Sequence, residues 1–133
     1  MDPVDSTRLR SFIRSTLGCG CPDDVLNFID CTHTEIGEEQ VTRISRIDVG
    51  GRLLVYVLDA APNPHWAISA LPAIVAAGLV ERDGLGFNRL RVVVAADDPE
   101  AIQQDVERCY ADCAPADSNL HLHVVEAGEL PFA

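Results

Sequence analysis

The chain has 133 residues, of which 47% are hydrophobic and 23% are charged, so residues 1–133 have the composition of a single globular domain. The chain has 21 acidic residues and 10 arginines but no lysine, so its net charge is −11. A surface this acidic repels phosphate backbones and anionic lipids. The composition therefore argues against nucleic acid and membranes as partners.

The N-terminus and the cysteines indicate the compartment. Met1, Asp2 and Pro3 lead directly into a charged helix, so no signal peptide is expected. The most apolar stretch, residues 71–80, is about half as long as a membrane span. Five cysteines are an odd number in a chain without secretory features. They favour reduced thiols or a metal site in the cytoplasm over paired structural disulfides.

The order of elements is read from periodicity and from helix-terminating residues. The predicted elements are helices over residues 5–17 and 22–29, a loop over 32–40, strands over 41–49 and 53–59, a helix over 64–78, a loop over 82–86, a strand over 90–96, a helix over 99–113 and a strand over 120–126. Gly18 is suited to end the first helix and Pro22 to begin the second. These two helices form a predicted helical hairpin, about residues 5–30.

The predicted sheet-and-helix body covers about residues 41–126 and is organised around the strand at 53–59. That strand is the longest unbroken run of β-type apolar residues, so both of its faces must be covered. Gly50 and Gly51 before it predict a tight hairpin, because both positions accept positive φ. Helices join the last three strands, which should therefore be parallel. The expected fold is an α/β domain with a mixed four-stranded sheet and an N-terminal helix pair covering its second face.

The helix over 64–78 is unusual because almost no polar side chain interrupts it. Asn63 is the expected cap and Pro72 should kink the helix. A helix that is apolar on all sides is buried on all sides, and one small sheet covers only one of them. We expect either the N-terminal helices or a second copy of the chain to cover the rest. The second alternative predicts a homodimer.

A cluster of soft ligands lies between residues 19 and 33. Three thiols and an imidazole, from Cys19, Cys21, Cys31 and His33, make a complete ligand set for zinc or an iron–sulfur centre. Cys19 and Cys21 could instead form a reducible disulfide. The spacing differs from that of common zinc motifs. The alternative is that Cys31 is a small core residue and His33 a surface loop residue.

Other candidate residues have a simpler structural explanation. Cys109 and Cys113 continue the helical core stripe of Ile102 and Val106, which favours a packing role. His121 and His123 share one strand face and could chelate a metal, but solvated histidines are the more common case.

The carboxyl edge of the sheet, where ligands bind in open α/β folds, carries a set of polar residues: Asp59, Asn63, His65, Asp97, Asp98 and Glu126. Most of them are better explained as helix caps or solvated strand ends. No glycine-rich phosphate loop follows a strand, so no nucleotide is expected.

Three functional hypotheses follow. The first is a small soluble metal-binding or thiol-redox accessory protein that uses the N-terminal cysteines. The second is a non-catalytic homo-oligomeric interaction module, which leaves room for another protein as partner. The third is a small enzyme with an acidic site at the carboxyl edge of the sheet.

Overall fold

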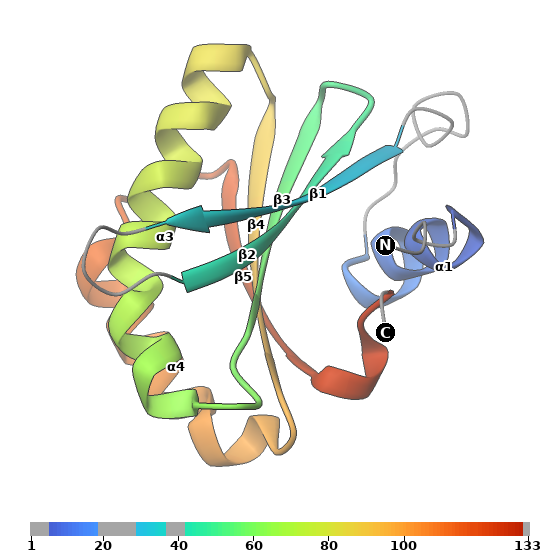
Figure 1. Ribbon diagram of the computed structural model, residues 1–133. Helices are drawn as coiled ribbons and strands as arrows, with labels where there is room; N and C mark the ends of the chain where they lie inside the picture. The colour runs from blue at the N-terminus through green and yellow to red at the C-terminus, as the bar shows by residue number, and fades with distance from the viewer. Residues whose placement is uncertain (1–5, 19–28, 37–41, 132–133) are drawn as a thin grey trace.

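The computed structural model describes residues 6–18, 29–36 and 42–131 (Figure 1). Its elements are α1 Ser6–Ser11, the π-helical turn η1 Phe12–Thr16, β1 Ile29–Ile36, β2 Thr42–Val49, β3 Leu53–Asp59, α3 Pro64–Leu85, β4 Arg89–Ala96, α4 Pro99–Cys113, β5 Leu120–Glu126 and the 3-10 turn η2 Ala127–Glu129. The fold is that of a mixed α/β domain.

The five strands lie in the order β1-β2-β3-β4-β5, so each strand pairs with its neighbour along the chain. The pairs β1–β2 and β2–β3 are antiparallel, and β3–β4 and β4–β5 are parallel. Because the order is monotonic, both crossover helices pack on one face, as Figure 1 shows for α3 and α4, while α1 lies on the other. The prediction of a mixed sheet with three parallel strands is confirmed.

The predicted strand number is wrong, because the sheet has five strands rather than four. The additional strand, β1, occupies most of the segment expected as a loop, and it includes Ile29, which was expected in the second helix. Residues 22–28 of that expected helix lie outside the described residues. An edge strand needs apolar side chains on one face only. Here Ile29 and Cys31 pack against the core, while Asp30 and Thr32 are exposed.

The α1 face of the sheet is covered by the first helix and its π-helical turn. Four buried side chains pack there on alternate residues of β2 to β5: Leu9, Phe12, Ile13 and Leu17. Two arginine side chains form hydrogen bonds between this layer and distant parts of the chain. Arg8 Nη2 donates to the carbonyl oxygen of Leu130 at 3.1 Å, and Arg91 Nη1 donates to that of Leu17 at 2.8 Å.

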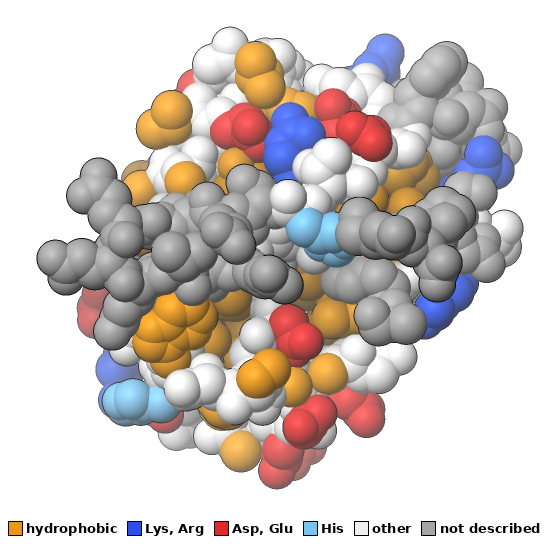
Figure 2. Space-filling view, in the orientation of Figure 1, with side chains coloured by type: hydrophobic (Ala, Val, Ile, Leu, Met, Phe, Trp, Pro, Cys, Tyr) orange, Lys and Arg blue, Asp and Glu red, His pale blue; other side chains and the backbone are white. Residues whose placement is uncertain are grey.

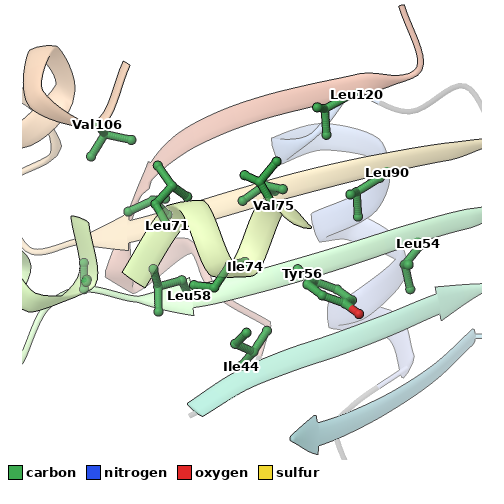
Figure 3. Packing of buried hydrophobic residues seen from close by; sticks show 14 of the residues in the cluster. Ile44, Leu54, Tyr56, Leu58, Leu71, Ile74, Val75, Leu90, Val106 and Leu120 are labelled. Carbon is green, nitrogen blue, oxygen red and sulfur yellow. The ribbon is translucent and has the colours of Figure 1, made fainter. Parts of the chain in front are cut away.

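The α3 face holds the second core cluster (Figure 3). Leu71, Ile74 and Val75 of α3 are buried against the sheet side chains of this face. Val106 is the fully buried contact of α4 with the same cluster. Cys109 and Cys113 are partly buried against it, in agreement with the predicted packing role.

Helix α3 is longer than predicted, since it continues through Gly78 to Leu85. Gly78 is a packing residue rather than a terminator, because a Cβ there would lie 2.7 Å from Leu90 Cδ2. The helix ends at Gly86, whose φ of 78° suits glycine. Within the part of the chain that is described, α3 alone is long and apolar enough to cross a membrane by length and composition. Only 28% of its apolar window is buried, because one stripe packs on the sheet and on α4 while the opposite side stays exposed.

Candidate functional site

An open hollow of about 720 Å³, here called the strand hollow, lies between the C-terminal half of α3 and the strands β1 to β3. The strands contribute four of its lining residues and α3 contributes five: Thr32, His33, Arg46 and Tyr56, and Ala77, Val80, Glu81, Gly84 and Leu85. Thr32, Arg46 and Tyr56 are register partners on adjacent strands, so their side chains form one row on the α3 face. The pleat thus places three polar side chains beneath the helix.

Glu81 connects the two polar side chains on the sheet side of the strand hollow, Arg46 and Tyr56. Its Oε1 accepts from Arg46 Nε at 2.6 Å and from the Tyr56 hydroxyl at 2.8 Å. Arg46 also lies over the ring of Phe87, 5.8 Å from its centroid. Figure 3 shows Tyr56 among the apolar side chains of the core, with its ring packed inside and its hydroxyl oxygen at the edge. The charges of Arg46 and Glu81 are therefore paired and fixed in place.

The tyrosine in this network is a hydrogen-bond donor rather than a base. Burial, followed by the hydrogen bond to Glu81, raises the pKa of Tyr56 well above its ordinary value. The phenol consequently stays protonated at neutral pH and keeps donating to Glu81. The network therefore consists of a satisfied ion pair and a protonated phenol, and Tyr56 is not activated as a nucleophile.

The outward side of α3 forms a crest of small and apolar residues. Ala73, Ala76 and Val80 are exposed there, opposite the buried stripe, and 75% of Val80 is accessible. Leu85, at the end of the helix, is 64% accessible. No charged residue occurs between residues 66 and 80. Figure 2 shows hydrophobic side chains on the part of the surface that α3 occupies in Figure 1.

A second hollow of about 470 Å³ lies on the other side of the crest, between α3 and α4, and is here called the thiol hollow. Its lining includes His65, Ser69, Pro72, Cys109 and Cys113. Burial raises the pKa of both thiols, so neither is activated as a nucleophile.

The predicted cysteine cluster is described only in part. Cys19 and Cys21 lie outside the described residues. Cys31 and His33 are two apart on β1 and so share its α1 face. Cys31 packs against the core, and burial followed by the charge of Asp30 raises the pKa of its thiol. His33 Nδ1 is 2.9 Å from Ser45 Oγ. Whether the four residues bind a metal stays a prediction.

Two residues of the predicted acidic edge, Asp59 and Asn63, form hydrogen bonds to nearby backbone amides. Asp59 Oδ1 accepts from the amide of Ala61, and Asn63 Oδ1 accepts from the amide of Trp66 as the cap of α3. Asp98 occupies the N-cap position of α4 without a side-chain hydrogen bond to it. All six predicted edge residues are exposed: Asp59, Asn63, His65, Asp97, Asp98 and Glu126. The described residues contain no group of three histidine, cysteine or acidic side chains placed to hold a metal ion.

Sequence reasoning missed the strand hollow because two segments were expected to be loops. Thr32 and His33 fall in the strand read as a loop, and Gly84 and Leu85 in a helix expected to end at Gly78. The available signal was the alternation of Arg46 with the buried residues of β2, which places a charged side chain on the α3 face. Its acidic partner, Glu81, should then have been sought on the covering helix.

Comparisons with protein-family models, with curated proteins and with solved structures gave no match to this chain.

Proposed function

We propose that the protein is a non-catalytic interaction module that pairs with a second copy of itself through α3. The observation that carries this proposal is the crest of Ala73, Ala76 and Val80, an apolar helix face that no described element covers. The alternative cover expected from the sequence was the N-terminal helix pair. The first of these helices, α1 with η1, packs on the opposite face of the sheet, and residues 22–28 of the second lie outside the described residues. An uncovered apolar helix face is typical of an interface.

The shape of the surface around the crest, with a hollow on either side, suits a two-fold pair. The strand hollow borders the crest on the side of the sheet, and the thiol hollow borders it on the side of α4. In a two-fold pair the crest of each copy can lie in a hollow of the other, so one surface serves both partners. The alanines let two helices approach closely. The net charge of −11 over the remaining surface opposes further growth of the assembly.

Light scattering across the accessible concentration range tests this proposal. We expect a mass of two chains at micromolar protein, and a mass of one chain for Ala76→Glu and for Val80→Glu. Both positions are exposed in the single chain, so the variants should keep the circular dichroism spectrum and the melting behaviour of a folded protomer. The matched control is Gln104→Glu, which adds the same charge at an exposed position of α4.

The proposal fails if the unmodified protein has the mass of one chain at every concentration. It also fails if Gln104→Glu dissociates the pair as completely as Val80→Glu does, because a general charge effect would then explain the result. If another protein occupies the crest instead, light scattering should detect a stable complex of two different chains.

A second candidate function is a zinc or iron–sulfur accessory protein, or a thiol-redox one, in the cytoplasm. The observation in its favour is that Cys31 and His33 share one face of β1, as two ligands of a single site must. With Cys19 and Cys21 they would complete the set of four donors. Because the pKa of the Cys31 thiol is raised, metal binding would release a proton there and strengthen with pH.

Elemental analysis and an absorption spectrum of protein purified without oxygen test this second candidate. We expect about one zinc ion or one iron–sulfur centre per chain, lost in Cys21→Ser and in Cys31→Ala, with a lower melting temperature in both variants. Cys109→Ala is the control for a cysteine outside the set and should keep the metal. Metal-free protein whose stability does not rise with added zinc or iron rules this function out.

A further inference from the structure

Arg91 is a nearly buried cation that uses only part of its hydrogen-bonding capacity. It lies on β4 and faces the α1 side of the sheet, with 9% of its surface accessible. Both of its hydrogen bonds to described residues use Nη1, which donates to the carbonyl oxygen of Leu17 and lies 2.8 Å from His123 Nε2. Its Nε is buried and has no hydrogen-bond partner among the residues that the structure describes. An unpaired donor of a buried charged group is costly, so it points to a missing acceptor.

The surroundings of Arg91 are basic in a protein that is otherwise acidic. His121 is its register partner on β5, and His123 follows on the same face. Arg89 lies two residues before Arg91 on the same strand face. Burial, followed by the charge of Arg89, lowers the pKa of Arg91. No carboxylate among the described residues forms an ion pair with Arg91 that would compensate it.

We propose that Arg91, His121 and His123 form a binding site for a small oxyanion, a phosphate or a carboxylate. The site is on the α1 face and is independent of the crest, since α3 lies on the opposite face of the sheet. Such a ligand supplies what the guanidinium lacks: an acceptor oxygen for Nε and a compensating negative charge.

The chemistry of the three side chains fits an oxyanion better than a metal ion. The fork of an arginine donates in parallel to two oxygens of a carboxylate or phosphate. Burial, followed by the charges of Arg91 and His121, lowers the pKa of His123 to about 4, so its ring is neutral and accepts from Arg91. A bound anion would reverse this effect and favour protonated rings that donate to it. The two partly exposed histidine rings connect the site to solvent.

Nuclear magnetic resonance of the arginine Nε–H groups and the histidine rings tests the site directly. Sodium phosphate and sodium acetate are added in separate titrations, with sodium chloride keeping the ionic strength constant. We expect a saturable shift of the Arg91 Nε–H signal and higher pKa values for His121 and His123 at saturation. Tighter binding of phosphate assigns the site to phosphate-bearing ligands, and tighter binding of acetate assigns it to carboxylates.

Two variants and a control separate this site from general charge effects. Arg91→Met should weaken anion binding about tenfold or more, because it removes the charged donor. Since Arg91 also anchors Leu17 and its loss can unfold the chain, His121→Gln at the rim provides a second variant, for which we expect weakening by a few fold. Arg108→Gln removes the same charge from an exposed position on α4 and should leave binding unchanged.

The proposal is overturned if neither anion gives a saturable shift, or if Arg108→Gln weakens binding as much as Arg91→Met. It is also overturned if the Nε–H of Arg91 is already hydrogen-bonded to a carboxylate of the chain itself without added anion. A direct scalar coupling across that hydrogen bond would show this.

Discussion

The thiol of Cys109 on α4 donates a hydrogen bond to the backbone carbonyl of Ile68 on α3, with 3.5 Å between the sulfur and the oxygen. That carbonyl is the one that residue 72 would normally satisfy within the helix, and residue 72 is a proline without an N–H. The cysteine therefore supplies from the neighbouring helix a donor that α3 lacks. This gives the half-buried thiol a structural role that needs no reactivity.

The bond between Cys109 and Ile68 should be measurable as a coupling with Pro72. We expect Cys109→Ala to lower the free energy of unfolding by about 1 kcal/mol, because the carbonyl loses its partner. In the Pro72→Ala background the helix supplies its own N–H, so the same substitution should be less damaging by about 0.5 kcal/mol or more. Urea unfolding of the four proteins gives the cycle. Equal losses in both backgrounds would show that the thiol contributes nothing to this carbonyl.

Gly78 and Gly84 lie in the same helix and should respond in opposite ways to alanine. A Cβ at Gly78 would meet Leu90, whose side chain is fully buried and cannot move aside, whereas a Cβ at Gly84 meets nothing within 4 Å. Gly78→Ala should therefore destabilise the domain by about 1–2 kcal/mol. Gly84→Ala should stabilise it by about 0.5–1 kcal/mol through helix propensity. Thermal or urea unfolding compares them, and a stabilised Gly78→Ala would contradict the packing described for this helix.

Arg82, a buried arginine, joins the end of α3 to the loop before β5 and should matter more for stability than an exposed arginine does. It is 8% accessible, and its Nη2 donates to Asp117 Oδ2 at 2.7 Å while Nη1 donates to the Asn119 carbonyl. Arg82→Met should lower the free energy of unfolding by about 1–2 kcal/mol, since the Asn119 carbonyl and the Asp117 carboxylate lose their donor. Arg108→Met, in an exposed pair, should change it by less than about 0.5 kcal/mol. Similar effects of the two substitutions in urea unfolding would contradict this assignment.

The stability of the domain should depend on pH through His123. Its pKa is lowered from 6.5 to about 4 in the folded protein, whereas the unfolded chain keeps the ordinary value. Between these two values the unfolded state binds more protons, so the free energy of unfolding rises with pH from about 4 to 6.5. Urea unfolding in chloride buffer should show this slope in the wild type and a smaller one in His123→Gln. An identical slope in both proteins would mean that the histidine is not shielded from protonation.

The elements from residue 42 onward are largely predictable from the sequence because each carries a signal on its own. β3 is apolar on both faces, and α4 begins at Pro99 and ends before Pro115, as its sequence indicates. β1 was not predictable by the same reasoning, since only Ile29 and Cys31 in its first half need to be apolar in an edge strand. The end of α3 was missed because a glycine that packs against a neighbour resembles a glycine that stops a helix.

The candidate sites were harder to predict because they depend on register and not on spacing along the chain. Arg46 and Glu81 meet only because β2 and the extended α3 are brought together by the sheet. Arg91 and His123 likewise come from neighbouring parallel strands. The alternation along β5 correctly separated its two faces. The face that carries His121 and His123 is expected to be solvated, however, until the buried Arg91 on the neighbouring strand is known.

The monotonic strand order has a consequence for the nascent chain. Each strand can pair as soon as the next one has been synthesised, so the sheet can grow from β1 to β5 without waiting for a distant partner. The cover of the first helix is completed only later. Two of its hydrogen bonds join it to residues made afterwards: Arg91 binds the Leu17 carbonyl, and the Leu130 carbonyl accepts from Arg8, 122 positions away along the sequence. The apolar stripe of Leu9, Phe12 and Ile13, made first, packs on β2 to β5, so its burial is complete only when the last strand has joined the sheet.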